Sequence, residues 1–217
     1  MVDDNFKNIS DILLKYSIKS YFKSKPTLIN SSKHTNIKYE LKNCTYELMD
    51  IINNISSRRK LMDRYIFCKE NNIEIVYDSV ISETFLENLK MVDTTFPQIL
   101  AYKLLDSYND KTKNFIDLIT GKLEIFQFMK FIEYFGLSAF PSKEWDGKIV
   151  VNGGFIEVEK DLSIKILDLV YDKENILNNM FENLKFDSPS TTRYNMFEVF
   201  KENDSYYITL NVQIRYR

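Results

Sequence analysis

The spacing of hydrophobic and polar positions changes several times along the chain, and each change predicts a different element. Residues 5–23 carry apolar side chains near helical spacing, with serines and lysines between them, which predicts an amphipathic helix. Pro26 ends this pattern, because a residue before proline avoids the helical region. Residues 37–42 then alternate apolar and polar side chains, as a half-buried strand does.

Capping residues mark the next elements. Thr45 precedes an apolar stripe that runs to Ile55, which predicts a helix with Thr45 as its N-cap. A second helical pattern runs through residues 61–66 and ends near residues 71–72, and a short strand is predicted at 73–77. Ser82 is predicted to cap a further helix.

Three more helices are predicted before residue 140. They cover residues 96–106, 112–119 and 126–135, and the last two are joined by residues 121–125. Gly136 is predicted to cap the end of the third, because glycine adopts the left-handed conformation that closes many helices.

The pattern beyond residue 141 predicts a mixed unit. Residues 148–151 and 155–158 are predicted to pair as a hairpin around Asn152-Gly153-Gly154, since an Asn-Gly pair suits a tight turn. A helix over 161–185 and a hairpin of residues 196–200 with 206–216 follow. The expected fold class is α+β, with a mainly helical domain at 1–140 and a C-terminal hairpin–helix–hairpin unit at 141–217.

Composition narrows the choice of function. The 217-residue chain carries 29 basic and 31 acidic residues, and this balance argues against a general nucleic-acid binder. The N-terminus lacks the apolar segment of a secretory signal, and no apolar run is long enough for a membrane helix. Cys44 and Cys68 are expected to be reduced thiols, so a cytoplasmic protein is predicted.

Candidate chemistry is sparse. The single histidine, His34, lies in a polar loop, and two cysteines with one histidine fall short of a zinc site. No glycine-rich loop opens a helix to hold phosphate. The sequence therefore predicts no catalytic residue, no metal site and no cofactor, with one alternative. Glu40 and Lys42 lie two apart on a predicted strand and share a face, as in metal-dependent nucleases.

Two charged segments have a structural interpretation. Arg58-Arg59-Lys60 with Arg64 is predicted to be the solvated face of a helix rather than a phosphate contact. The C-terminal strand offers Tyr207 and Tyr216 beside arginines, a surface that could stack on single-stranded nucleic acid, but aromatic strand positions are more often core.

Residues 114–137 resemble the helical end of a BTB/POZ domain. Phe115 leads a helix that ends at Thr120-Gly121, a Leu-Glu-Ile stretch follows, and a second helix ends at Gly136-Leu137. The resemblance implies a non-enzymatic adaptor that self-associates and recruits a protein partner, sometimes a cullin. Its interface would lie on the helices that contain Phe85, Leu89, Phe126 and Phe131.

The abundance of Asn, Lys, Ile, Phe and Tyr indicates an AT-rich genome, such as that of a large DNA virus. The leading hypothesis is therefore a homo-oligomeric protein–protein interaction adaptor in the host cytoplasm or the virion, with a cullin-type or viral partner, no membrane and no nucleic acid. A structural component of a large DNA virus particle is one alternative. A metal-dependent nuclease that uses Glu40 and Lys42 is the other.

Overall fold

The computed structural model describes residues 14–20, 26–109, 113–188 and 194–217, and shows an α+β fold. None of the helices in these segments is long and apolar enough to cross a membrane. In chain order the elements are β1 (Tyr16–Ser20), β2 (Thr27–Ile29), η2 (Lys33–Thr35), β3 (Asn36–Lys42), α1 (Tyr46–Asn54), α2 (Lys60–Glu70), β4 (Glu74–Val80), α3 (Glu83–Lys90), α4 (Phe96–Asn109), α5 (Phe115–Leu118), α6 (Lys122–Leu137), β5 (Gly154–Val158), β6 (Ile164–Asp168), α7 (Leu169–Asn183), β7 (Leu184–Phe186), β8 (Phe200–Glu202), β9 (Ser205–Asn211) and β10 (Ile214–Tyr216).

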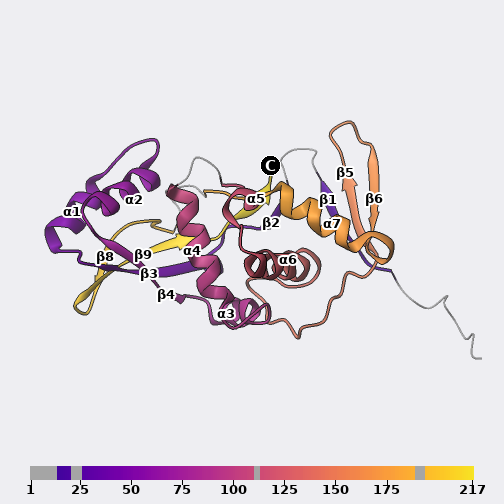
Figure 1. The fold of residues 1–217 in the computed structure, drawn as a ribbon, viewed down its shortest axis with the longest axis horizontal. Coiled ribbons are helices and arrows are strands. Elements are labelled where there is room, and N and C mark those ends of the chain that lie inside the picture. The colour runs from indigo at the N-terminus through magenta and orange to yellow at the C-terminus, as the bar shows by residue number, and fades with distance from the viewer. Residues whose placement is uncertain (1–13, 21–25, 110–112, 189–193) are drawn as a thin grey trace, which may run out of the picture.

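The strands form three sheets, ordered β4-β3-β9-β8, β2-β10-β7 and β1-β5-β6. Figure 1 shows the four-stranded sheet with α1 and α2 at one end of the molecule and the β5–β6 hairpin at the other, with α6 between them. Each sheet contains strands from both sides of residue 140. The predicted domain boundary near residue 141 would separate two units that fold independently, and it stays a prediction.

The predicted elements between residues 36 and 90 are confirmed. The strand at 37–42 is β3, and it pairs with β4 and β9. Thr45 caps α1 by accepting a hydrogen bond from the Leu48 amide, and Ser82 caps α3 by accepting one from the Phe85 amide. Local capping chemistry and a helix-length apolar stripe decided these elements, so the sequence was sufficient to find them.

An aromatic cluster forms the centre of the core. The ring of Phe96 lies 5.1 Å from Phe128 and 5.2 Å from Phe131, centroid to centroid, and Phe131 lies 4.9 Å from Phe135. Three of the four residues assigned to a self-association surface are core residues of one chain, since Phe85, Leu89 and Phe131 are fully buried. The fourth, Phe126 on α6, is 62% exposed.

The predicted helix over residues 5–23 is wrong where the structure describes it, because residues 16–20 form β1; residues 5–13 and 21–23 lie outside the described residues. The predicted hairpin of 148–151 with 155–158 is also wrong. Strand β5 pairs instead with β6, in antiparallel fashion, and with β1, in parallel fashion. The predicted helix over 161–185 therefore begins only at Leu169, after β6.

The glycines explain the second error. A Cβ atom on Gly154 would lie 1.9 Å from the Leu167 carbonyl oxygen, and its φ of +143° is one that other residues rarely adopt. A Cβ on Gly153 would lie 2.7 Å from the ring of Tyr16. These glycines permit close strand packing rather than a turn. Gly136, predicted to end a helix, lies inside α6, which continues to Leu137.

Arg64 corrects the prediction of a solvated basic helix face. It is 1% exposed, and its guanidinium donates hydrogen bonds of 2.6 Å to the carbonyls of Phe197 and Asn53. Asn53 also donates to the Val199 carbonyl and accepts from the Val199 amide. The two side chains tie α1, α2 and the segment before β8 together, because each satisfies buried backbone groups that would otherwise lack a partner.

We expect Arg64→Met to lower the free energy of unfolding by about 3 kcal/mol, because two backbone carbonyls lose a charged donor. Urea denaturation followed by circular dichroism measures this. Arg59→Met is the matched control: the Arg59 side chain is 71% exposed, so its loss should change stability by less than about 0.5 kcal/mol. Equal stability of the two variants would contradict the assigned role of Arg64.

Candidate active site

Two places in the structure bring a lysine and an acidic residue onto the same face of a sheet. The first is the polar face of the four-stranded sheet, where the sequence predicted a pair. Glu40 and Lys42 lie on β3, and the Lys42 Nζ atom is 2.6 Å from Glu40 Oε2. Strand alternation places both side chains on the face opposite Tyr39 and Leu41, which are buried.

Glu40 is already engaged by two partners. Its other carboxylate oxygen accepts a 2.9 Å hydrogen bond from the Ser205 hydroxyl on β9. The pKa of Glu40 is lowered, first by the hydrogen bond from Lys42 and second by that from Ser205. The contact with Glu40 in turn raises the pKa of Lys42. Both side chains therefore stay charged at neutral pH and neutralise one another.

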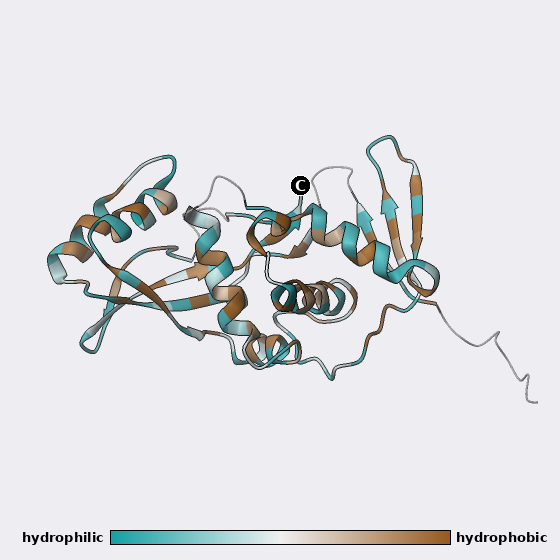
Figure 2. Ribbon diagram, in the orientation of Figure 1, coloured by the Kyte–Doolittle hydropathy of each residue, from teal (hydrophilic) through white to brown (hydrophobic). Residues whose placement is uncertain are grey.

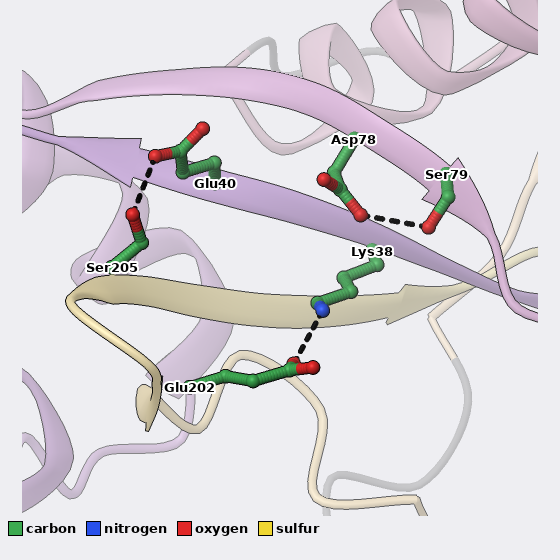
Figure 3. A network of polar contacts seen from close by, with 6 residues as sticks. All are labelled: Lys38, Glu40, Asp78, Ser79, Glu202 and Ser205. Carbon is green, nitrogen blue, oxygen red and sulfur yellow. Dashed lines mark hydrogen bonds and ion pairs between the residues drawn. The ribbon is translucent and has the colours of Figure 1, made fainter.

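The neighbouring polar groups are paired in the same manner. Lys38 Nζ lies 2.5 Å from Glu202 Oε2 and 4.0 Å from the centre of the Tyr207 ring. Asp78 stands at the irregularity between β3 and β4, and its carboxylate accepts a 2.7 Å hydrogen bond from Ser79. Figure 3 shows Glu40 and Asp78 on adjacent strands, each held by a different hydroxyl. The charged side chains on this face are therefore each paired with a neighbouring residue.

The second place is a pocket of about 530 Å³ beside β1. Its wall includes Tyr16, Ser17 and Lys19 from β1, and the remaining described lining residues come from 27–32, 135–142 and Val151. Hydroxyl and amide groups line it, among them those of Ser17, Thr27, Asn30, Ser32, Ser138 and Ser142. Lys19 supplies the only charge among these described lining residues.

Lys19 differs from the lysines of the first site. Burial lowers the pKa of its ammonium group below the ordinary value. Its Nζ atom lies 5.6 Å from the centre of the Phe155 ring, and no carboxylate within the described segments forms an ion pair with it. Glu157 is its register partner on β5, so both side chains leave the sheet on one face. A desolvated cation in a polar pocket is suited to bind an anion.

Sequence reasoning missed Lys19 because it assigned residues 5–23 to a helix. Read as a strand, Tyr16-Ser17-Ile18-Lys19-Ser20 places Ser17 and Lys19 on one face, and that alternation is the signal that could have found the site. The other candidates lie elsewhere: His34 is half-buried in the short helix η2. Of the C-terminal aromatics, Tyr216 is buried.

The described residues do not form a complete metal centre. No group of three His, Cys, Asp or Glu side chains that could hold a metal ion occurs within them. Mg²⁺ is commonly held by one or two carboxylates together with water and substrate phosphate, and Glu40 has both of its oxygens engaged by Lys42 and Ser205. This donor set does not fit a resident metal, so no chemical step is assigned to one.

Comparison with known proteins identifies the class of this chain. The chain matches the HpaII restriction endonuclease family model over residues 4–216, so it belongs to that family. It is 30% identical over 219 residues to the type II restriction enzyme HpaII of Haemophilus parainfluenzae, covering 94% of this chain and 60% of that protein. The chain thus spans about three fifths of that relative's length. No solved structure matches it.

Family membership overturns the BTB/POZ resemblance. A non-enzymatic adaptor, a cullin-type or viral partner and the exclusion of nucleic acid are wrong for a family of DNA-cleaving enzymes. The resembling segment is α5 and α6, whose Phe115, Phe128 and Phe131 are fully buried core residues. Of the hypotheses from sequence, the nuclease alternative agrees best with the family.

The lowered pKa of Lys19 leads to a test of stability. We expect Lys19→Met to leave the Tm at neutral pH equal to or above that of the unchanged chain, because a protonated lysine is disfavoured by burial there. Between the lowered pKa and 10.5, the unfolded chain binds more protons than the folded chain. The unchanged chain therefore gains stability relative to Lys19→Met as pH rises through this window.

Thermal unfolding from pH 7 to 10.5 measures the difference, with Lys42→Met as the matched control. The pKa of Lys42 is raised by its contact with Glu40, so its contribution to stability should stay constant over this range and be lost only above pH 10.5. A lower Tm for Lys19→Met at pH 7, or parallel pH dependence of the two variants, would contradict the desolvation of Lys19.

Proposed function

We propose that this chain cleaves DNA, and that Lys19 acts at the phosphodiester bound in the pocket beside β1. Membership of the HpaII restriction endonuclease family supports the reaction class. The observation that carries the assignment to this pocket is Lys19 itself, a desolvated lysine without a described carboxylate partner in a polar pocket of about 530 Å³.

The chemistry follows from the charge of the phosphodiester. An ammonium group in the pocket donates a hydrogen bond to a non-bridging oxygen and stabilises the negative charge that grows there when water attacks phosphorus. A half-buried cation is more effective in this role than a fully hydrated one, because water screens it less. The hydroxyls of Ser17 and Ser32 provide neutral donors for the adjoining sugar and phosphate oxygens.

The Glu40–Lys42 pair is the second candidate site for the same reaction. Its spacing on β3 favours it, and the carboxylate stays ionised because its pKa is lowered. Two observations argue against this pair. Lys42 forms an ion pair with Glu40, which raises the pKa of Lys42, and the Lys42 side chain is 48% exposed. We therefore assign Lys19 to the phosphodiester and Glu40 to the support of the sheet through Ser205.

We expect the purified chain to nick or linearise supercoiled plasmid, assayed both with and without added Mg²⁺ or Mn²⁺. Lys19→Met should reduce the rate by about 10²–10³-fold, as the loss of one charged transition-state donor does. Glu40→Ala should retain most of the activity. Lys90→Met is the control for the loss of a lysine, because Lys90 forms an exposed pair with Glu87 on α3. Gel analysis gives the rates, and fluorescence anisotropy of labelled duplex gives DNA affinity.

The outcomes separate the two sites. Loss of cleavage in Glu40→Ala with full activity in Lys19→Met would move the active site to the polar sheet face. Loss in Lys19→Met, with the fold shown intact by circular dichroism, supports the pocket. Absence of both cleavage and DNA binding in the unchanged chain would contradict the proposed function.

A further inference from the structure

A long irregular segment joins α6 to β5 and forms part of the pocket beside β1. Residues 138–153 belong to no helix or sheet, and only an isolated bridge joins Phe140 to Lys143. Figure 2 shows this segment passing α3 and running on toward the hairpin β5–β6. Irregular segments longer than about 12–15 residues are usually functional when they are ordered. Residues 138–142 line the pocket, so its shape depends on what holds this segment in place.

One buried side chain outside the pocket holds the start of this segment. Asn88 on α3 is 2% exposed and is not a lining residue of the pocket. Its Nδ2 atom donates hydrogen bonds of 2.8 Å to the carbonyls of Phe140 and Lys143. Its Oδ1 atom accepts a hydrogen bond of 3.2 Å from the amide of Trp145. Both polar atoms of the Asn88 side chain therefore bind the backbone of one short turn.

The turn that Asn88 holds carries residues of the pocket wall. Phe140, Pro141 and Ser142 line the pocket, and the two carbonyls that accept from Asn88 flank Pro141 and Ser142. The hydrogen bond within the turn, from the Lys143 amide to the Phe140 carbonyl, is 3.3 Å long. The bonds from Asn88 are shorter and hence stronger, so they contribute more to the position of the wall than the turn does by itself.

Two further contacts fix the segment but do not reach α3. The Ser138 hydroxyl accepts a hydrogen bond of 2.5 Å from the Val150 amide, which brings the two ends of the segment together. The ring of Trp145 lies 4.6 Å from the ring of Tyr134 on α6, centroid to centroid. Of these contacts, the hydrogen bonds of Asn88 alone connect the segment to α3.

An asparagine at this position is costly to the helix and to the core. Asparagine is a weak helix former, and burial of an amide is unfavourable unless its hydrogen bonds are satisfied. The neighbouring core positions of α3, Phe85 and Leu89, are apolar. Packing of α3 does not require an amide between them, so the three hydrogen bonds to residues 140–145 explain Asn88.

We propose that Asn88 is a positioning residue of the active site assigned above, an inference that rests on the proposed function. Its amide fixes the wall at residues 140–142, so that the pocket keeps the shape in which a phosphodiester meets Lys19. Asn88 is buried and acts only through these residues. Groups around a reacting phosphate need to be held within about 0.5 Å of their productive positions, and a shift of about 1 Å lowers the rate by about 10²-fold.

The single tryptophan of the chain reports on this contact without DNA. Trp145 lies in the segment, and its amide is bound to Asn88. We expect Asn88→Ala to shift the tryptophan emission to longer wavelength and to increase its quenching by acrylamide, because the segment is released from α3 and opens to solvent.

Asn53→Ala is the matched control for the loss of an amide. Asn53 also binds a backbone carbonyl and a backbone amide, both of Val199 and both at 2.8 Å, and it is not a lining residue of the pocket. Its loss removes contacts of the same kind far from Trp145, so the tryptophan emission and quenching of Asn53→Ala should equal those of the unchanged chain.

Plasmid cleavage by the full chain gives the second readout, at a temperature where circular dichroism shows each variant folded. We expect Asn88→Ala to lower kcat about tenfold or more with a change in KM of less than about threefold, because positioning is lost in the transition state. Asn53→Ala should keep the kcat of the unchanged chain. Asn88→Asp has the same shape and serves where Asn88→Ala does not fold. Its ionised carboxylate cannot donate to either carbonyl, so its kcat relative to the unchanged chain should recover partly as pH falls and the carboxyl binds a proton.

Three results would overturn the proposal. Unchanged tryptophan emission and quenching in Asn88→Ala would mean that other contacts hold the segment. Altered fluorescence with an unchanged kcat would mean that the position of the wall does not matter to the reaction. An equal loss of kcat in Asn88→Ala and Asn53→Ala would assign the effect to general stability.

Failure of the proposed function would give a different result. Absence of cleavage by the unchanged chain would remove the reaction, and with it the role of Asn88 in positioning. The fluorescence of Trp145 would still decide whether Asn88 holds the wall, because it is measured without DNA.

Discussion

The parallel pairing of β1 with β5 is the contact on which the proposed site depends. It joins residues 16–20 to residues 154–158, so forming this pair requires closure of a long stretch of chain. The pairing places Lys19 over Phe155 and beside the end of α6, where the pocket is walled by residues 135–142. The sequence feature that permits it is Gly153-Gly154, since any side chain at Gly154 would collide with the backbone of β6.

The elements that sequence could predict are those decided by local chemistry. Thr45 and Ser82 cap helices that the apolar stripes already indicate, and β3 alternates because one of its faces is buried. Strand β1 could not be recognised in this manner, because its apolar face points to solvent and its polar face to the pocket. The prediction assumed that apolar positions mark the core, and in this strand they do not.

The functional prediction failed for a related reason. Net charge is a sum over the molecule, and a sum near zero was taken to exclude nucleic acid. In the fold, Lys38, Lys42 and Lys90 are each bound to a carboxylate, whereas Lys19 has no described carboxylate partner. The stabilisation of a bound phosphate depends on the local field of a nearby unpaired cation rather than on the net charge of the molecule. The balance of 29 basic against 31 acidic residues therefore says little about the substrate.

The same comparison separates the two carboxylate–lysine sites. On β3 the charges of Glu40 and Lys42 neutralise one another at the solvent-exposed surface. An ion pair there contributes little to stability and leaves no charge free to bind a ligand. At β1 the fold holds an ammonium group where burial disfavours its charge, over the ring of Phe155. A side chain kept at a cost to folding is explained when it stabilises a bound anion. Ile18 and Lys19 are adjacent in β1, and strand alternation places their side chains on opposite faces of one sheet.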